Sequence, residues 1–260
     1  MQTNTFEWQK TPQLSIFQFL LATFIPSGIG LIGFHFVLPA MVKNGTPVLI
    51  AWPAIASVML FGFVVVAIYM LRREAKTMGI SLWTRMCLKP LSLKEWGIYL
   101  GIAVVGLAAI SGIQTLIPGM LKAIGYTIPA YMPFFLNPAI DATTASMDVV
   151  SPGLPLQGAY PVLLLFVVAL LLNILTEELY FRAWMLPKLS HYGNRSWVIN
   201  GLLFALYHVF QLWLFPVLLV SSLLFAFIFY RTKSIWLPMT AHLIGNFLLS
   251  ILGILFLIAS

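Results

Sequence analysis

Two adjacent glutamates and an arginine stand in the stretch NILTEELYFRAWM, directly after a long apolar run. Glu178 and Arg182 are four residues apart, so they share one face of a helix and can form an ion pair. Glu177 is turned away from that face by about 100°, which leaves it without a cation nearby in the sequence. The spacing predicts that Glu178 and Arg182 support each other while Glu177 is free to do chemistry. The alternative is that all three charges reach toward water from the end of an apolar helix.

Polar side chains recur at four-residue spacing in two later apolar segments. In NGLLFALYH, residues Asn200, Phe204 and His208 fall on one helical face, and in HLIGN the same holds for His242 and Asn246. Ionisable groups within apolar segments are expected to face the interior of a bundle and to have a partner there. We therefore expect three helices to meet around one polar cavity.

Such a cavity has the components for hydrolysing an amide bond. Burial disfavours the charged form of a carboxylate and makes it a better general base. A histidine beside it can hold and polarise a water, and a second histidine with an asparagine amide can donate hydrogen bonds to an oxyanion. No serine in a G-x-S-x-G turn and no cysteine near these residues competes for the role of nucleophile. Three more residues are candidates to line the cavity: Asn173, Asn200 and Phe204.

The composition of the chain indicates which kind of structural element holds these residues in place. The chain has 260 residues, of which 61% are hydrophobic and 8% charged, whereas a soluble domain carries about 25% charged residues. Several apolar runs approach the ~20 residues that span a bilayer as a helix. The sequence predicts one all-α polytopic membrane domain over residues 1–260, with six to eight transmembrane helices and the motifs in a core at about 158–258. The expected spans, seven in number, are about 14–40, 47–71, 96–117, 158–183, 196–210, 213–230 and 234–258.

Basic residues predict the orientation in the membrane. Twelve of the fourteen fall on one side of a seven-span arrangement, and only Lys43 and Lys122 fall on the other. Cytoplasmic loops carry an excess of Lys and Arg, so we expect a multi-pass protein of the plasma membrane with a cytoplasmic N-terminus and a cavity open to the cytoplasm. The partners are then the lipid bilayer and a peptide or protein substrate. No basic stripe lies apart from the membrane ends, so nucleic-acid binding is not expected.

Four further features have simpler interpretations. The loop at about 118–157 is expected outside the membrane, away from the cytoplasm, and contains no catalytic grouping. His35 stands alone in an apolar run and is expected to pack or to bond the backbone, while His191 in KLSHYGN is expected in water. Cys87, the single cysteine, is expected to be a small buried residue.

The three motifs together resemble those of a known family. EELYFR, FALYH and HLIGN match, in order, the patterns EExxxR, FxxxH and HxxxN of the CPBP family of CAAX proteases and bacteriocin-processing enzymes, also called the Abi family. The match covers about Leu175 to Asn246, and Ala183 stands where many members have glycine. The resemblance implies an intramembrane glutamic endopeptidase that needs no metal and no cofactor, here in a prokaryotic cell.

The resemblance also implies a role for each motif residue. Glu177 would be the general base, and His208 would orient the attacking water. His242 and Asn246 would stabilise the oxyanion, and the pair of Glu178 with Arg182 would support the site. Eukaryotic relatives trim prenylated C-terminal CAAX tails, so the substrate could be lipidated in this way or be a small unmodified peptide.

Three other functions stay open on the sequence alone. Glu177, His208 and His242 could be the ligands of a zinc-dependent membrane protease, although the H-E-x-x-H spacing is missing. The chain could also be a membrane scaffold or a bacteriocin immunity protein that keeps the cavity without turnover. A transporter that uses the buried carboxylate as a proton relay is the third alternative.

The mechanism makes one geometric demand. His208 lies about 18 Å along its span at 1.5 Å per residue, whereas Glu177 falls near the predicted end of the span at about 158–183. The two residues can meet if that helix continues past Arg182 toward Pro187. We therefore predict a continued helix, with the side chains of Glu177 and His208 within roughly 8 Å of each other so that they can share a water.

Overall fold

Only helices and connecting segments occur in the part of the chain that the computed structural model describes, which is residues 6–141, 144–246, 254–255 and 258. No strand is found among these residues, which confirms the all-α prediction. Within this described part of the chain, five helices are long and apolar enough to cross a membrane, and they confirm an integral membrane protein. They are Ile16–Lys43, Val48–Met78, Leu93–Ala123, Tyr160–Lys188 and Val209–Thr232.

Most of the long helices are built from shorter pieces with different winding. The first consists of α1 (Ile16–Ile32), a π-helical segment (Gly33–Val37) and α2 (Leu38–Lys43), and the second is α3 (Val48–Met78). The third joins α5 (Leu93–Gln114) to α6 (Ile117–Ala123). The fourth joins α8 (Tyr160–Glu177), a π-helical segment (Glu178–Met185) and α9 (Leu186–Lys188), and the fifth joins a 3-10 segment (Val209–Leu214) to α11 (Phe215–Thr232).

The prediction of seven spans is not confirmed. α10 (Ser196–Tyr207) has 12 residues and the described part of α12 (Trp236–Asn246) has 11, which at 1.5 Å per residue gives about 18 Å and about 16 Å. A hydrocarbon core is about 30 Å thick, so neither helix crosses it over these residues. The predicted span at 234–258 extends into residues 247–253, which lie outside the described part of the chain.

Short helices precede or connect the long ones. They are the 3-10 turns Trp8–Lys10, Phe134–Leu136 and Ser190–Arg195 and the α-helices α4 (Leu82–Arg85) and α7 (Met147–Val150). The long helices begin and end with ordinary capping interactions. Ser15 with Gln18 and Ser92 with Glu95 form capping boxes at the starts of α1 and α5, and Gly79 ends α3 in the left-handed conformation.

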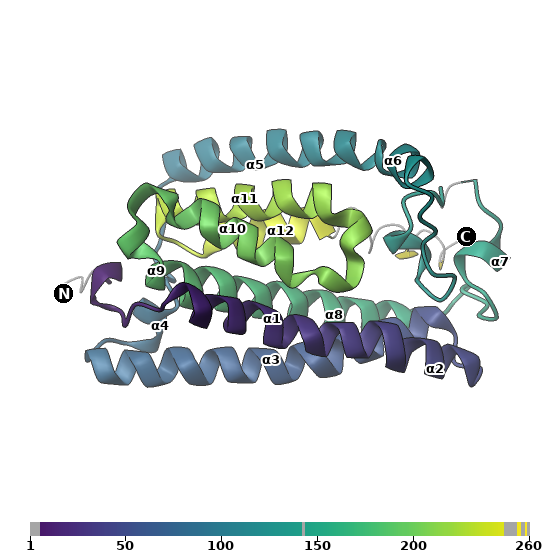
Figure 1. Cartoon of the computed structure of the whole chain (residues 1–260), viewed down its shortest axis with the longest axis horizontal. Coiled ribbons are helices and arrows are strands. Elements are labelled where there is room, and N and C mark those ends of the chain that lie inside the picture. The colour runs from purple at the N-terminus through teal and green to yellow at the C-terminus, as the bar shows by residue number, and fades with distance from the viewer. Residues whose placement is uncertain (1–5, 142–143, 247–253, 256–257, 259–260) are drawn as a thin grey trace.

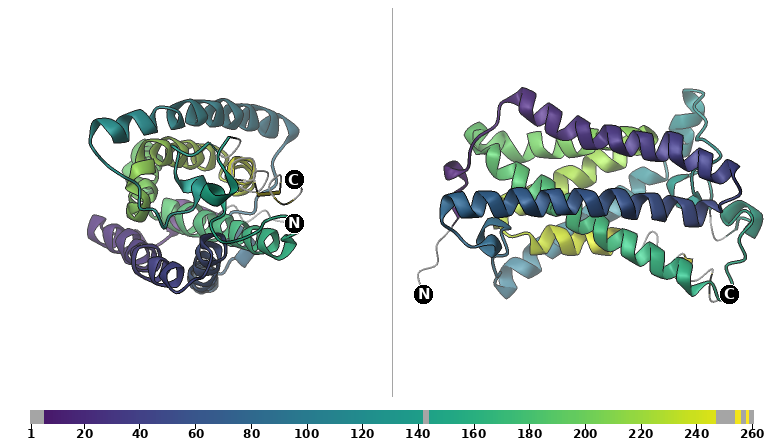
Figure 2. Two further views of the ribbon diagram at one scale, coloured as in Figure 1. Left: turned by 90° about the vertical axis from the view of Figure 1, so that its right-hand side faces the viewer. Right: turned by 90° about the horizontal axis from the view of Figure 1, so that it is seen from below.

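The helices form a bundle in which the motif-bearing segments lie in the middle. α1, α3 and α8 lie along one side, α5 lies along the opposite side, and α10, α11 and α12 run between them (Figure 1). The end-on view in Figure 2 shows the same arrangement. α10 and α11 pack closely at Gly201. A Cβ added there would lie 2.8 Å from a methyl carbon of Leu223. A larger residue at 201 would push the two helices apart.

The two ends of the bundle differ in charge. The N-terminal turn, α4 and α9 lie at one end, and α2 and α6, which carry Lys43 and Lys122, lie at the other (Figure 1). Contacts between distant basic segments hold the first end together: Lys188 donates to the carbonyl of Pro12, and the ammonium of Lys233 lies 3.3 Å from the ring centroid of Trp8. The basic residues thus gather at one end as the sequence predicts, except for Arg182, which is buried within the bundle.

Candidate active site

Glu177 is placed by the helix that carries it. Thr176 donates a hydrogen bond to the carbonyl of Leu60 on α3 (3.1 Å), and Tyr180 donates to the carbonyl of Ala22 on α1 (2.8 Å). These two bonds fix the rotation of α8 against its neighbours on both sides of the glutamate. Glu177 is 3% exposed and faces the interior of the bundle.

The fourth helix continues past Arg182, as predicted, and reaches Lys188. Glu177 therefore lies about 16 Å from the Lys188 end, and His208 lies about 18 Å from the start of α10 at Ser196. Both helices begin or end at the basic end of the bundle, so the two residues are at the same depth. His208 Nε2 lies 3.5 Å from Glu177 Oε1, well inside the limit of roughly 8 Å set above for a shared water.

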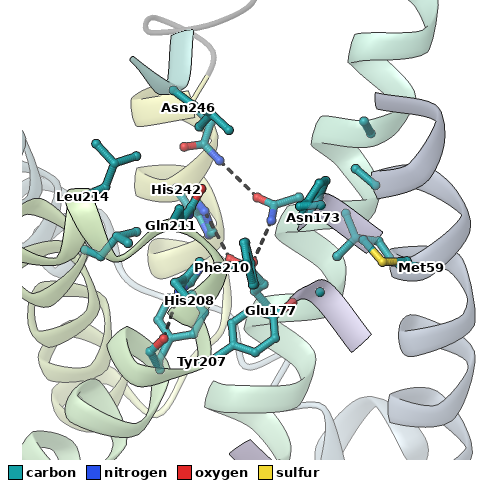
Figure 3. A pocket seen from close by; sticks show the side chains of 18 of the residues that line it. Met59, Asn173, Glu177, Tyr207, His208, Phe210, Gln211, Leu214, His242 and Asn246 are labelled. Carbon is teal, nitrogen blue, oxygen red and sulfur yellow. Dashed lines mark hydrogen bonds and ion pairs between the residues drawn. The ribbon is translucent and has the colours of Figure 1, made fainter. Parts of the chain in front are cut away.

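Glu177 is surrounded by groups from three helices, as Figure 3 shows. Asn173, one turn earlier on α8, donates a hydrogen bond to Oε1 (2.7 Å). His208 approaches the same oxygen, and His242 Nε2 lies 3.7 Å from Oε2. Asn246 donates to the side-chain oxygen of Asn173 (3.1 Å). The structure thus brings the motif residues of α8, α10 and α12 together around one carboxylate.

The partners of the two imidazole rings determine where their protons lie. His208 Nδ1 is 2.9 Å from the carbonyl oxygen of Phe204, and because a carbonyl only accepts, Nδ1 carries the proton. His242 Nδ1 is 3.1 Å from Oε1 of Glu178, so it carries a proton when that carboxylate is ionised. A neutral form of either ring therefore turns the lone pair of Nε2 toward Glu177. A water at this point can donate one proton to the carboxylate and one to an imidazole.

Glu178 and Arg182 form the predicted ion pair. Arg182 Nε lies 3.5 Å from Glu178 Oε2, and both side chains are fully buried. The guanidinium also lies 4.4 Å from the ring centroid of Phe204 and donates to Asn200 (3.4 Å). The contact of Glu178 with His242 was not predicted, because helical spacing within one segment says nothing about a residue 64 positions away. Glu178 therefore contacts both Arg182 and His242.

The site opens into a cavity of about 1020 Å³. Asn173 and Phe204 are among its lining residues, as predicted, but Asn200 is not. Asn200 instead donates to the carbonyl of Phe181 (2.8 Å) behind Arg182. The wall formed by α1 and α3 is apolar, with residues such as Ile25, Ile29 and Met59.

Several residues that line the cavity were not found from the sequence. Tyr180, Tyr207 and Gln211 line the cavity beside the motif residues. The two tyrosines occupy variable positions inside the motifs EExxxR and FxxxH, and this position was the available signal. No sequence signal pointed to Gln211, because it lies in a 3-10 segment beyond the helical pattern.

The remaining histidines and the cysteine lie as expected. His35 bonds the backbone carbonyl of Phe210 (2.8 Å) and the hydroxyl of Tyr131 (3.0 Å), and His191 is exposed. Cys87 is buried at 4% exposure. Within the described residues, no group of three or more His, Cys, Asp or Glu side chains is arranged to hold a metal ion.

One family model matches the chain. Residues 159–248 match the family described as type II CAAX prenyl endopeptidase Rce1-like. This segment contains all three motifs and the complete set of residues around Glu177, and it confirms the resemblance to the CPBP family of CAAX proteases. The matched family is one of membrane proteases, which supports a peptide-bond hydrolase. No curated protein and no solved structure gives a significant match.

Proposed function

We propose that this Rce1-like chain is an intramembrane endopeptidase in which Glu177 is the general base. The observation that carries the proposal is the convergence of one carboxylate and two imidazole Nε2 atoms, at 3.5 and 3.7 Å, in a cavity buried among apolar helices. These groups come from three separate helices, and a purely structural role would not need them to converge on one point.

The residues suggest a direct attack by water. A water held between Glu177 and His208 gives one proton to the carboxylate as its oxygen attacks the carbonyl carbon of the substrate. The negative charge that develops on the carbonyl oxygen is stabilised by the amide of Asn246 and by His242 in its protonated form. When the C–N bond breaks, the proton on Glu177 moves to the leaving amine.

The substrate and the orientation follow from the same features. We infer that the substrate is a peptide or protein that enters the cavity within the membrane, with a prenylated C-terminal tail as the first candidate. The basic end of the bundle lies in the cytoplasm, and the cavity receives substrate from that side. We further infer that α10 and α12, which are short among the described residues, complete a bundle of about seven helices in the plasma membrane of a prokaryotic cell.

Peptide cleavage by purified protein tests the proposal. The protein in detergent is incubated with prenylated and unmodified peptides, and the products are identified by mass spectrometry. We expect cleavage at one position, reduced by about 10²–10⁴-fold in Glu177→Gln, the range that general bases contribute. Glu95→Gln is the matched control, because Glu95 caps α5 far from the cavity and glutamine preserves the capping box. Equal cleavage by Glu177→Gln and the parent protein would show that Glu177 is not the base.

A further inference from the structure

Gln211 lies in the turn that follows His208. Its backbone N–H donates to the carbonyl of His208 (2.9 Å), and its backbone (φ −144°, ψ 48°) interrupts the 3-10 segment Val209–Leu214. The side chain lines the cavity, and Figure 3 shows Gln211 on the same side as His208 and His242, opposite Asn173. Gln211 is therefore tied directly to the residue proposed to hold the water.

The side-chain amide of Gln211 has no hydrogen-bond partner among the described residues, although the residue is half-buried. Its neighbours Phe210 and Trp213 are buried and apolar. A primary amide in such surroundings is unfavourable unless a ligand or water supplies partners. The group is thus available to bind something that enters the cavity.

Several other polar groups of the cavity are already engaged. Asn173 bonds Glu177, the hydroxyl of Ser221 donates to the carbonyl of Leu218, and Asn137 accepts from the backbone of Ala139. Gln211 and Gln114 differ from these in having no partner among the residues described. Of the two, only Gln211 belongs to the turn that carries His208.

The distribution of polarity in the cavity indicates what Gln211 binds. The residues contributed by α1 and α3 carry one polar side-chain group, the buried indole N–H of Trp52, whereas Gln211 and Gln114 come from the segment before α11 and from α5. A peptide that enters a cavity enclosed by apolar helices must satisfy its backbone N–H and C=O groups. A primary amide can donate to the one and accept from the other, so the peptide runs along the wall that carries Gln211.

From this placement we propose that Gln211 holds the backbone of the substrate peptide beside the scissile bond. This inference rests on the proposed peptidase function and assigns a binding residue to it. The peptide lies along the α10–α11 wall, and an apolar part of the substrate lies along the α1–α3 wall.

Kinetics of two matched variants test the role of Gln211. Gln211→Met keeps the length of the side chain and removes its hydrogen bonds, and Gln114→Met makes the same change on α5 in the same cavity. A bond present in both the ground state and the transition state affects KM and leaves kcat alone. We expect KM to rise about tenfold in Gln211→Met, the effect of one lost hydrogen bond, and little change in Gln114→Met. A fall in kcat at constant KM would show that Gln211 only positions His208, and equal effects of both variants would show a general need for polarity; either result overturns the proposal.

A modified substrate locates the contact. Peptides are prepared in which one backbone amide at a time, on either side of the scissile bond, is replaced by an ester. At the amide that Gln211 contacts, the ester and Gln211→Met should each raise KM, and together they should raise it no further, because the same bond is lost only once. Additive effects at every position would overturn the proposal.

Binding separates this inference from the proposed function. Glu177→Gln is used as a non-cleaving background, and the affinity for the fluorescently labelled peptide is measured with and without Gln211→Met. A loss of about tenfold is expected from the second change, whether or not the protein turns over substrate. Absence of cleavage by the parent protein would count against the peptidase function, while an unchanged affinity would count against Gln211 alone.

Discussion

At the scale of single residues, His242 links the two glutamates of the site. Its Nδ1 lies 3.1 Å from Glu178 and its Nε2 lies 3.7 Å from Glu177. A neutral ring with its proton on Nδ1 cannot donate from Nε2, so His242 can stabilise an oxyanion only when it is protonated. In that form Nδ1 donates to the carboxylate of Glu178 while Nε2–H is available to an oxyanion. Glu178 therefore has a part in the chemistry beyond its pairing with Arg182.

Substitution of Arg182 distinguishes the pairing of Glu178 with Arg182 from its contact with His242. Arg182→Met leaves the buried carboxylate without its cation, and breaking a buried pair in this way costs about 3–5 kcal/mol. We expect a lower unfolding temperature in detergent, with Arg73→Met, on the exposed surface of α3, as the unaffected control. Adding Glu178→Gln should restore stability but not cleavage, because this second change removes the charged partner of His242. A double variant with full activity would contradict this assignment.

Cys87 predicts a dependence of stability on alkaline pH. Burial raises the pKa of its thiol from 9.0 to about 12. The unfolded chain loses the thiol proton first, so the folded state loses stability as the pH rises from 9 toward 12, by at most about 1.4 kcal/mol per pH unit. Cys87→Ala removes this titration. The unfolding temperature of the parent protein should fall relative to that of Cys87→Ala above pH 9 and match its trend below pH 9; parallel curves throughout would contradict the prediction.

At the scale of elements, the π-helical segment Glu178–Met185 carries the site and is held from outside the motifs. Arg85, fully buried on α4, donates to the backbone carbonyls of Ala183 and Trp184 and to Glu74 of α3. Glu74 also accepts from the indole of Trp184 (2.9 Å) and pairs with Lys188 (2.6 Å). The wider winding leaves carbonyl groups that need other donors, and Arg85 supplies them.

Arg85 should therefore control the order of this segment. Arg85→Met removes the donors to two carbonyls and leaves Glu74 with fewer partners. We expect faster amide hydrogen exchange in residues 178–188 and slower cleavage. Arg195→Met, at an exposed position in the Ser190–Arg195 turn, should change neither. Unchanged exchange in Arg85→Met would mean that the segment holds its winding without this contact.

The elements also show what the sequence could and could not predict. Apolar runs located the five long helices, and the need for Glu177 to meet His208 predicted a helix that continues past Arg182 toward Pro187; in the structure it reaches Lys188. The π winding was not predictable, because it depends on donors such as Arg85 that lie about a hundred residues away. The contact of His242 with Glu178 and the partners of Asn200 were missed for the same reason: four-residue spacing reports which residues share a face, and not what that face meets.

At the scale of the whole molecule, the cavity is covered at the end opposite the basic residues. Residues 134–138 and Ile140 line it there, the indole of Trp213 donates to the carbonyl of Leu136 (2.8 Å), and His35 contacts Tyr131. The rings of Trp52 and Phe135 meet edge to face at 5.1 Å beneath this cover. Such a cover favours the arrival of substrate from the basic end or from the membrane.

The orientation of the whole bundle can be tested with single cysteines. Loops rich in Lys and Arg stay in the cytoplasm, so we expect Arg195 inside and Lys122 outside; both side chains are exposed. In a Cys87→Ala background, Arg195→Cys and Lys122→Cys are expressed separately in bacterial cells and treated with a maleimide that does not cross membranes. Cysteine at 122 should react in intact cells, and cysteine at 195 should react only after the membrane is opened. The reverse pattern would place the basic end outside and would mean that a cytoplasmic substrate cannot reach Glu177 from that end.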